Sequence, residues 1–410
     1  MKTDKLLETY KMGFYEYACV DATDRIVCIG IGKIFEYYLN MFNKMNISHK
    51  IMVLIDNDEG KQGVTKEIGG RDLIIRSFSY LENMVEENED FIILITTDKK
   101  HYETVLYQLK LSHIPDKIYV GFAENLQDER FQRAVTCSNL YRHMNIGIGD
   151  RGENMTISIL AHNRAELTIR LIDSICEQLS GFQGEILIGD NKSSPDELNA
   201  VKARMQRCNL KWRILEFDTH HPIPKGKNLL NREVETDWIM QLDNDTYFTD
   251  NPLKKISADI GELGCPIWGL PCFDTRYKKV VNYGSNLDFI YDNNELKIRC
   301  CVDLLFYQTE RQWLPMICTY AAGGLSLFRK ELFWNLQGYD ENLYMFEDID
   351  FMYRVNMQGY KVGNVGMVSL VHDHKEICSE LGRNYEAIRF DTDRIKQSKK
   401  YLMNKYGFVF

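Results

Sequence analysis

Short apolar runs and helix-spaced apolar residues alternate along the first third of the chain. Asp24–Gly30 has the composition of a strand, and the apolar residues after it recur at helical spacing, namely Ile34, Tyr37, Tyr38, Met41 and Phe42. The other expected elements are strands at Lys50–Ile55, Leu73–Ile75, Phe91–Thr96 and Ile118–Val120, and a helix over Val105–Leu111. Strands and helices that alternate in this way predict a parallel, doubly wound sheet.

A tight turn with two glycines, Gly30 and Gly32, follows the first of these strands, and Asp56 follows the second. Dinucleotide-binding folds combine such a turn with an acidic residue and with a third glycine that lets the helix approach the strand closely. The third glycine position holds the bulky Phe35 here. The sequence therefore favours a purely structural turn, with an NAD-linked activity of this domain as an alternative.

A second series of strands and helices begins at Met155, just after the clustered glycines Gly147, Gly149 and Gly152. The expected strands are Met155–Leu160, Glu185–Ile188, Trp212–Phe217 and Trp238–Leu242, and the expected helices are Glu166–Leu179, one beginning at Pro195 and a short one opening at Lys225–Asn228. The predicted organisation is an α/β protein with a Rossmann-like domain over 1–150, a second α/β domain over 151–380 and a helical tail over 381–410.

The apolar strand Trp238–Leu242 runs directly into Asp243, Asn244 and Asp245. A strand that ends in this way delivers both carboxylates to the carboxyl edge of the sheet, where ligands bind in open α/β folds. Two carboxylates this close repel each other unless a cation lies between them, and a hard divalent cation carrying phosphate oxygens is the usual partner. An isolated Asp-x-Asp is more often a solvated turn. The other motifs of the chain decide between the two interpretations.

Residues Met155–His374 resemble the family 2 glycosyltransferases, which have the GT-A fold. The motifs that carry the resemblance follow the family's order and are Asn163-Arg164, Ile188-Gly189-Asp190-Asn191-x-Ser193, Lys227-Asn228, Asp243-Asn244-Asp245, Gly323-Gly324-Leu325-Ser326, Gly338-Tyr339-Asp340-Glu341, Glu347-Asp348-Ile349-Asp350, Gly359-Tyr360 and Val371-His372. Two positions depart from the family pattern: Lys227 stands where Arg is commoner, and Gly189 stands where a β-branched residue is frequent. The N-terminal third resembles, more loosely, the small Rossmann-like modules of bacterial surface-polysaccharide enzymes.

This resemblance implies binding of a UDP- or GDP-linked sugar together with Mn²⁺ or Mg²⁺. The implied nucleotide-sugar contacts are Asn163, Arg164, Asp190, Asn191, Lys227, Asp243, Asn244 and Gly324. The implied metal ligands are Asp243, Asp245 and His372, and His374 competes with His372 for the histidine role. A satisfied, half-buried histidine is an equally good interpretation of His372.

The resemblance also implies that Asp348 is the general base that takes the acceptor hydroxyl proton, with Glu347 beside it, in a single displacement that inverts the anomeric centre. Carboxylates at a helix N-terminus are favoured by capping and by the helix dipole without any function. Three acidic residues among the four of Glu347–Asp350 exceed what a cap requires.

The segment Gly264–Ala322 carries the weakest pattern and is expected to shape the acceptor site. Within it, Ser285–Ile298 predicts a hairpin that turns at Asp292–Asn294. Core packing is the commoner use of large aromatic residues, and stacking on sugar rings is the alternative for Trp268, Trp313 and Tyr320. The tail Arg389–Tyr406 is basic and helix-like, which favours a solvated face over contact with an anionic membrane surface.

Composition and charge exclude other classes. A net charge of −9 argues against nucleic acid as the main partner, because binding to phosphates requires a basic face. No apolar run approaches a membrane span, and the eleven scattered cysteines contain no C-x-x-C pair. We expect reduced thiols and a cytoplasmic protein, with contact at the inner face of the membrane as a further possibility.

The sequence therefore predicts a metal-dependent, inverting glycosyltransferase of the GT-A type whose acceptor is a surface glycan or a lipid-linked sugar. The rival from another class is a catalytically silent protein that kept the fold for binding or scaffolding. Intact carboxylates at Asp190, Asp243, Asp245 and Asp348 argue against this rival, because loss of activity usually removes such groups first.

Overall fold

The computed structural model describes residues 12–13, 25–86, 91–112, 147–301, 305, 307, 312–373 and 391–407. Contacts divide the chain into two compact units. The N-terminal unit combines the described residues up to 112 with Asp288–Arg299, and the C-terminal unit combines residues 147–287 with those described from 300 onward. The expected strand Ile118–Val120 lies outside the described residues, and the domain boundary near residue 150 stays a prediction.

The N-terminal unit is built on a sheet of order β4-β5-β3-β2-β6. Its strands are β2 (Ile26–Ile29), β3 (Ile51–Ile55), β4 (Thr65–Ile68), β5 (Arg71–Arg76) and β6 (Ile92–Ile95). The four strands β5, β3, β2 and β6 pair in parallel, which confirms the expected parallel sheet. The edge strand β4 pairs antiparallel with β5, and its mostly polar sequence explains why no apolar run predicted it.

Three helices accompany this sheet: α3 (Lys33–Lys44), α4 (Phe78–Glu86) and α5 (Lys99–Leu111). The expected helical spacing after Gly32 is confirmed, because α3 buries Tyr37, Tyr38, Met41 and Phe42. Apolar residues of the strands and of α4 and α5 form one core, made of Val27, Ile29, Ile55, Phe78, Leu81, Met84, Phe91, Ile93, Ile95, Val105 and Leu109.

The glycine turn after β2 and the acidic residue after β3 contact other residues of the N-terminal unit. Gly30 has φ +93°, and a Cβ there would lie 2.3 Å from Thr97 Cγ2, so only glycine fits. Asp56 accepts hydrogen bonds from the Ile31 N–H at 2.7 Å and from Lys61 Nζ at 2.9 Å. Phe35 is only 1% exposed. The carboxylate that would bind a ribose therefore already has two donors.

The C-terminal unit is built on an eight-stranded sheet of order β17-β19-β12-β18-β10-β7-β8-β9. Its strands are β7 (Met155–Ala161), β8 (Glu185–Asp190), β9 (Lys211–Glu216), β10 (Trp238–Asp243), β12 (Ile267–Gly269), β17 (Met316–Cys318), β18 (Leu325–Arg329) and β19 (Val362–Asn364). β10, β7, β8 and β9 form a parallel block, and β18 runs antiparallel to β10. The carboxyl ends of the parallel strands therefore meet the start of β18 at one edge.

A second, four-stranded sheet has the order β11-β20-β13-β14, and its strand β11 follows β10 directly in the chain. Its strands are β11 (Thr246–Phe248), β13 (Cys272–Asp274), β14 (Lys279–Val281) and β20 (Leu370–His372). The antiparallel register sets Thr246 opposite His372, and the Asp373 N–H donates to Asp245 O at 2.9 Å. This pairing brings the end of β20 against the turn that follows β10.

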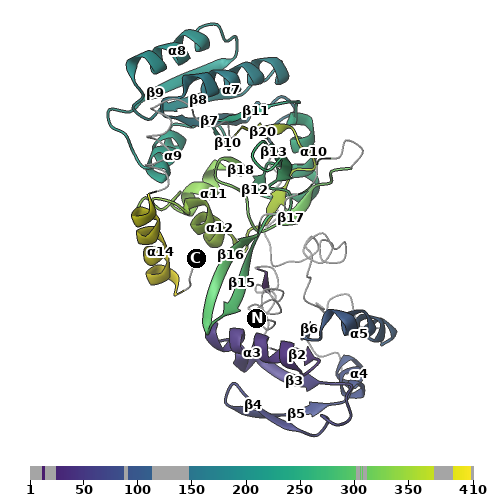
Figure 1. Cartoon of the computed structure of the whole chain (residues 1–410). Helices are drawn as coiled ribbons and strands as arrows, with labels where there is room; N and C mark the ends of the chain where they lie inside the picture. Colours follow the sequence, from purple (N-terminus) through teal and green to yellow (C-terminus); the bar gives the residue numbers. More distant parts are fainter. Residues whose placement is uncertain are drawn as a thin grey trace. The chain divides into compact units, whose positions relative to one another are not determined.

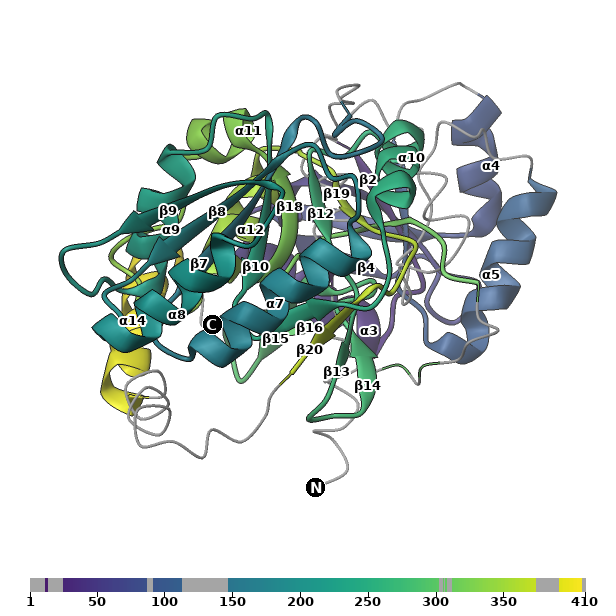
Figure 2. The same ribbon diagram turned by 90° about the horizontal axis from the view of Figure 1, so that it is seen from above.

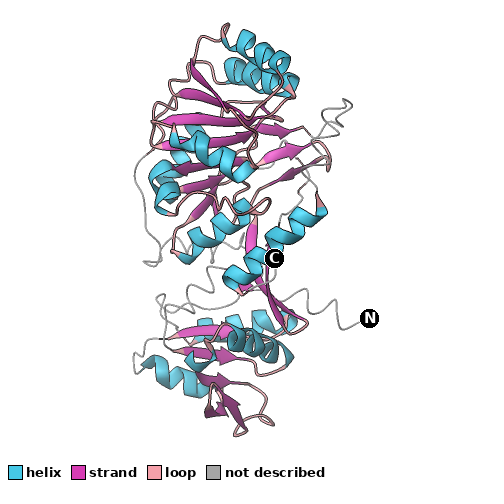
Figure 3. Ribbon diagram, turned by 90° about the vertical axis from the view of Figure 1, so that its left-hand side faces the viewer, coloured by secondary structure: helices cyan, strands magenta, loops and turns pink. Residues whose placement is uncertain are grey.

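Helices cover both faces of the large sheet (Figures 1–3). They are α7 (Ala165–Gln178), α8 (Pro195–Met205), α9 (Ile223–Arg232), α10 (Leu253–Leu263), α11 (Lys330–Asn335), α12 (Glu347–Met357) and α14 (Thr392–Tyr406). Helices α7 and α8 lie together on one face, and α9, α11 and α12 lie on the other (Figure 1). Among the described residues, no helix is both long enough and apolar enough to cross a membrane.

Two local expectations can be compared directly with this structure. The expected hairpin is confirmed as β15 (Asn286–Asp292) and β16 (Glu295–Cys301). Asn293 and Asn294 between them have φ of 50° and 63°, the left-handed pair that a two-residue hairpin turn requires. The acidic cluster was expected to precede a helix, but α12 begins at Glu347, so these carboxylates form its first turn.

We expect the N-terminal unit to bind no dinucleotide, because Phe35 is packed where the third glycine would be and Asp56 is held by Lys61. Calorimetric titration of the full chain with NAD(H) and NADP(H) should give no isotherm at micromolar concentrations. A clear isotherm that disappears in the Asp56→Asn variant would contradict this expectation.

Candidate active site

A cavity of about 660 Å³ opens in the C-terminal unit where the parallel strands end. Its walls are the end of β7, the turn after β10, the segment that leads into β18, the loop Tyr344–Phe346 and the first turn of α12. A cavity of this size lies within the range of small-molecule sites. Most of the expected site residues meet here.

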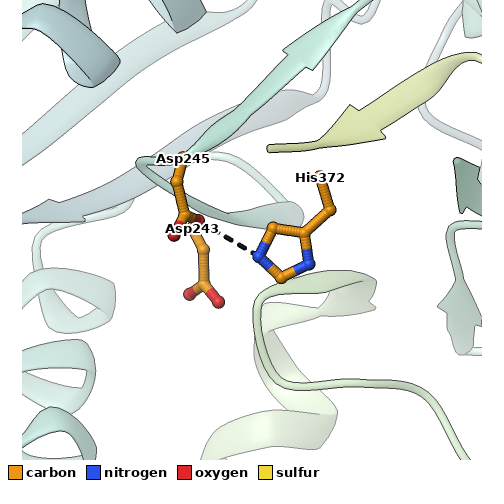
Figure 4. A group of neighbouring side chains, drawn as sticks. All are labelled: Asp243, Asp245 and His372. Carbon is orange, nitrogen blue, oxygen red and sulfur yellow. Dashed lines mark ion pairs between the residues drawn. The ribbon is translucent and has the colours of Figure 1, made fainter. Parts of the chain in front are cut away.

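Asp243, Asp245 and His372 form a compact cluster in this cavity, and the imidazole faces the two carboxylates (Figure 4). One ligand atom of each lies within 4.8 Å of the others, and His372 Nε2 lies 3.2 Å from Asp245 Oδ1. Burial lowers the pKa of His372, but the hydrogen bond and charge of Asp245 outweigh it and leave this pKa above its usual value. The cluster could hold a divalent cation. His374, the competing histidine, lies outside the described residues.

Arg164 orients the Asp245 side of this cluster. Its Nη2 donates to Asn244 Oδ1 at 2.6 Å and to Asp245 Oδ2 at 3.2 Å. Asn244 Nδ2 in turn donates to the buried Thr168 Oγ1 of α7 at 3.1 Å. The Arg164 backbone has a left-handed conformation, with φ 55°, at the position just before α7 begins. Arg164 and Asn244 therefore fix the rotamer of a carboxylate that is almost fully buried.

The glycine pair before β18 makes room for carboxylates on both sides. A Cβ on Gly324 would lie 2.0 Å from Asp243 Oδ2, and a Cβ on Gly323 would lie 3.0 Å from Asp348 Cβ. The first distance is an overlap and the second is a tight contact, so side chains here would displace one or both acids. Gly324, expected as a nucleotide-sugar contact, thus acts through the space that it leaves for Asp243.

Lys227 on α9 links the two groups of acids. The residue is only 4% exposed, and its Nζ donates to Gly323 O at 3.0 Å. The same atom lies 3.5 Å from Asp243 Oδ1 and 3.8 Å from Glu347 Oε1. Burial raises the pKa of Glu347 to about 7; Lys227 opposes this rise, and the charges of Asp348 and Asp243 add to it. Glu347 therefore gains or loses its proton near neutral pH in the metal-free protein.

Asp348 is held by donors of a different kind. Its Oδ2 accepts hydrogen bonds from Tyr320 Oη at 2.6 Å and from the Gly323 N–H at 3.2 Å, and its Oδ1 accepts from the Ile349 N–H at 2.8 Å. Burial and the Asp348 charge raise the pKa of Tyr320, so its hydroxyl stays protonated and donates at neutral pH. Asp348 is thus an oriented carboxylate at the cavity wall.

The expected nucleotide-sugar contacts fall into two groups. Those that line the cavity are Arg164, Asn191, Lys227, Asp243, Asn244 and Gly324. Asn163 and Asp190 are not among the lining residues. Asn163 N–H donates to Ser193 Oγ at 2.7 Å, and Asp190 Oδ2 accepts from the Ser193 N–H at 3.2 Å. These two residues secure the loop after β8, while Asn191 fastens it to the backbone of His221.

Sequence patterns missed several residues that shape this site. Arg170 pairs with Asp373 and lies 4.5 Å over the Tyr247 ring, which holds the end of β20 in place. Tyr320 was considered only for stacking or core packing, yet it holds Asp348. Contacts such as Arg170 with Asp373 join positions 203 residues apart, so no local spacing could have indicated them.

The two departures from the expected motifs have structural explanations. A Cβ on Gly189 would lie 3.1 Å from Leu230 Cδ1, so the glycine admits the close approach of α9 to β8. Lys227 reaches one backbone carbonyl and two carboxylates with a single, compact ammonium group.

Comparison with known proteins finds one matching family model. Residues 156–337 match the family model described as Glycosyl transferase family 2. Residues 156–337 of the C-terminal unit therefore have the sequence character of a glycosyltransferase family 2 domain. The match ends before α12 and β20, so Asp348 and His372 lie beyond it. No curated protein is significantly similar to the sequence.

Three solved structures illustrate the similarity. GalNAc-T7 with UDP, GalNAc and Mn²⁺ is 14% identical, with 57% of this chain and 48% of that chain covered at a TM-score of 0.43. Residues 1–349 of S. aureus TarS in complex with UDP are 16% identical, with 62% and 72% covered at 0.41. The mannosyltransferase PcManGT from Pyrobaculum calidifontis in complex with GDP-Man and Mn²⁺ is 14% identical, with 61% and 64% covered at 0.41. The chain thus spans about half the length of GalNAc-T7.

The raised pKa of Glu347 predicts how a Glu347→Gln variant changes stability. A carboxyl group whose pKa rises from 4.5 to about 7 binds its proton more tightly in the folded chain, so stability falls as pH rises between those values. Gln cannot ionise and avoids this loss, which is on the order of 1–3 kcal/mol. Thermal unfolding in chelator should show that the variant gains more over the wild type near pH 8 than near pH 5.

The matched control is Glu262→Gln, because Glu262 is exposed on α10. Its unfolding temperature relative to wild type should be the same at both pH values. An equal shift at both pH values for Glu347→Gln would show that burial does not raise the pKa of this carboxyl group.

Proposed function

We propose that this protein is a metal-dependent, inverting glycosyltransferase that moves a sugar from a nucleotide-diphosphate sugar to a hydroxyl acceptor. The observation that carries the proposal is that the Asp243–Asp245–His372 cluster and the pair Glu347 and Asp348 share one cavity. Transfer from a sugar nucleotide needs a neutralised diphosphate and a base for the acceptor. The two groups of side chains supply these two requirements.

The side chains present fit a bound cation. Their donor set is two carboxylates and one imidazole, with ligand atoms within 4.8 Å of one another. This mixture favours Mn²⁺ over Mg²⁺, because Mg²⁺ prefers oxygen ligands and keeps several waters. When bound, the cation would stabilise the negative charge that builds up on the departing diphosphate. Arg164 supports it indirectly, by holding Asp245 in one rotamer.

The chain's own residues provide the rest of the donor site. Lys227 Nζ lies beside Asp243 and can pair with a diphosphate oxygen that enters the cavity. We assign the nucleoside of a UDP- or GDP-sugar to the wall formed by Asn191 and His162, whose Nδ1 lies 2.8 Å from Asn191 O. Asp190 then supports nucleoside binding indirectly, because its hydrogen bond with Ser193 holds the loop after β8.

We assign the general base to Asp348 and a supporting role to Glu347. The charge of Glu347 interacts with the donor side of the site, because Lys227 lies between Glu347 and Asp243. Asp348 instead is oriented by Tyr320 and by the Gly323 N–H, and its carboxylate lines the cavity. A base whose orientation is fixed by two donors is ready to accept the proton of a hydroxyl that approaches the sugar from this wall.

The acceptor follows from the family resemblance alone, and we propose a growing surface glycan or a lipid-linked sugar at the cytoplasmic face of the membrane. The alternative is a catalytically silent protein with this fold. The close placement of Asp243, Asp245, Glu347 and Asp348 speaks against it, because four carboxylates in one cavity destabilise a fold that makes no use of them. Release of nucleotide from a panel of UDP- and GDP-sugars in the presence of Mn²⁺ separates the two.

Donor turnover should depend on a divalent cation and on Asp245. Asp245→Asn removes one ligand charge from the cluster, and loss of a ligand should cost at least as much as the ~10–100-fold typical of groups that only orient ligands. Nucleotide release should stop in excess chelator and return when Mn²⁺ is added. The control is Asp250→Asn in the exposed turn after β11, which should leave turnover unchanged. Full activity in chelator would refute the role of the metal.

Asp348→Asn should separate catalysis from binding. The substitution keeps the size of the side chain and one acceptor oxygen for Tyr320 and the Gly323 N–H, but it cannot take a proton, and general base catalysis contributes about 10²–10⁴-fold to rate. Transfer should fall by that factor, while calorimetry with UDP or GDP and Mn²⁺ should give nearly unchanged affinity.

Glu347→Gln is the matched comparison, and we expect a milder loss of transfer because Glu347 acts through Lys227. If Glu347→Gln were the inactive variant, the base would be Glu347, one residue earlier on the same helical turn. If Asp348→Asn weakened nucleotide binding and transfer equally, Asp348 would belong to the donor site.

A further inference from the structure

The C-terminal helix α14 contacts the loop that forms one wall of the cavity. Ser398 is 2% exposed, and its Oγ accepts hydrogen bonds from the backbone N–H groups of Tyr344 at 3.0 Å and Met345 at 3.4 Å. Arg394 lies 5.0 Å over the Tyr344 ring, and Lys399 lies 5.5 Å over the Phe346 ring. The loop Tyr344–Phe346 is therefore attached to α14 through both its backbone and its rings.

The last turn of α14 contacts α12 as well. Lys405 Nζ donates to Asp350 Oδ1 at 2.9 Å and to Asp340 Oδ2 at 2.6 Å, and the Tyr406 hydroxyl donates to Asp350 Oδ1 at 2.6 Å. Asp350 is fully buried, and Arg354 occupies its other oxygen at 2.7 Å. In Figure 1, α14 (yellow) lies beside α12. Two donors from α14 thus bind a buried carboxylate in the first turn of α12.

The parts that α14 contacts are the parts that present the acidic pair. Glu347 and Asp348 precede Asp350 in the same helical turn, and the Asp350 N–H donates to Phe346 O at 2.9 Å. Phe346 has φ +72°, a left-handed conformation that an aromatic residue keeps only when its surroundings hold it. Loop, left-handed residue and first helical turn form one segment, and α14 fastens it at both ends.

We propose that α14 is a brace that positions Glu347 and Asp348 for the acceptor half of the reaction. Ser398, Lys405 and Tyr406 are its positioning residues, since each acts through the segment 344–350 and none lines the cavity. The brace itself stands on these contacts alone, whereas its effect on transfer rests on the proposed function. Helix α14 lies beyond the family match, so it is a feature of this chain that the family assignment does not supply.

Three variants of the full chain test the brace. Tyr406→Phe removes one hydroxyl and keeps the ring, whose centroid lies 4.5 Å from that of Tyr353. Lys405→Met and Ser398→Ala remove the other two anchors. Lys396→Met is the matched control, because Lys396 is 76% exposed on the same helix and pairs only locally with Asp393. Thermal unfolding establishes that each variant is folded, and Tyr406→Phe is the least disruptive of them.

The first measurement is deuterium exchange of the amides in residues 344–350. Loss of an anchor to a buried or charged group should speed exchange there by about tenfold. Ser398→Ala should act most on the Tyr344 and Met345 amides, whose acceptor it removes. Lys396→Met should leave exchange in this segment unchanged. If Tyr406→Phe and Ser398→Ala exchange like the wild type in this segment, the brace does not exist.

The second measurement separates turnover from donor binding, with the nucleotide sugar that the wild type cleaves. The brace variants should lower kcat by roughly tenfold, in line with a small displacement of a catalytic group, while UDP or GDP binding with Mn²⁺ stays within about twofold. Equal losses in nucleotide affinity and kcat would show a general structural role and overturn the positioning role. If the wild type cleaves no nucleotide sugar, the proposed function fails, and the exchange measurement still decides the brace.

Discussion

Mutual repulsion among carboxylates is the constraint on which the rest of this site depends. Five carboxylates line one cavity, and the candidate site involves four of them, namely Asp243, Asp245, Glu347 and Asp348. The partners of these four differ: Asp245 pairs with Arg164, Asp243 and Glu347 share the ammonium group of Lys227, and Asp348 accepts hydrogen bonds from a hydroxyl and a backbone N–H. Burial raises the pKa of Glu347, and the single charge of Lys227, which also lies near Asp243, does not reverse this rise. The site keeps spare negative charge that a cation can balance.

The topology of the large sheet explains how these groups come so close. Strand β10 ends at Asp243 beside the start of the antiparallel β18, where Gly323 and Gly324 carry no side chains. The empty space over Gly324 takes the Asp243 carboxylate, and that over Gly323 takes Asp348 from α12. A reversed strand next to a parallel one therefore does more than extend the sheet. It lets the backbone that leads into β18 lie between an acid from β10 and an acid from α12.

The predictable parts of this fold are those whose causes are local. Apolar runs identified the buried strands β7, β8 and β10, and two consecutive asparagines marked the hairpin turn at Asn293 and Asn294 because that turn needs left-handed backbone. The carboxylates were visible for the same reason, since Asp243 and Asp245 end an apolar strand. The edge strand β4 had no such signal, and Tyr320 and Arg170 depend on partners far along the chain. Long-range pairing, which no spacing encodes, decided which aromatic and which arginine support the site.

Different parts of the chain hold the two halves of the cavity in place. The residues proposed for the donor half lie between His162 and Gly324, except His372, and are tied together by α7, α9 and the large sheet. Asp348 itself lies after residue 337, is held by Tyr320 and the Gly323 N–H, and belongs to a segment that is fastened by α14. The proposed donor half must bind the same diphosphate whichever hydroxyl receives the sugar, whereas the wall with Asp348 must suit the hydroxyl itself. The two halves therefore meet different demands. Lys227 and His372 connect the two parts of the chain, because Lys227 Nζ lies near both Asp243 and Glu347 and His372 joins Asp243 and Asp245 in the metal cluster.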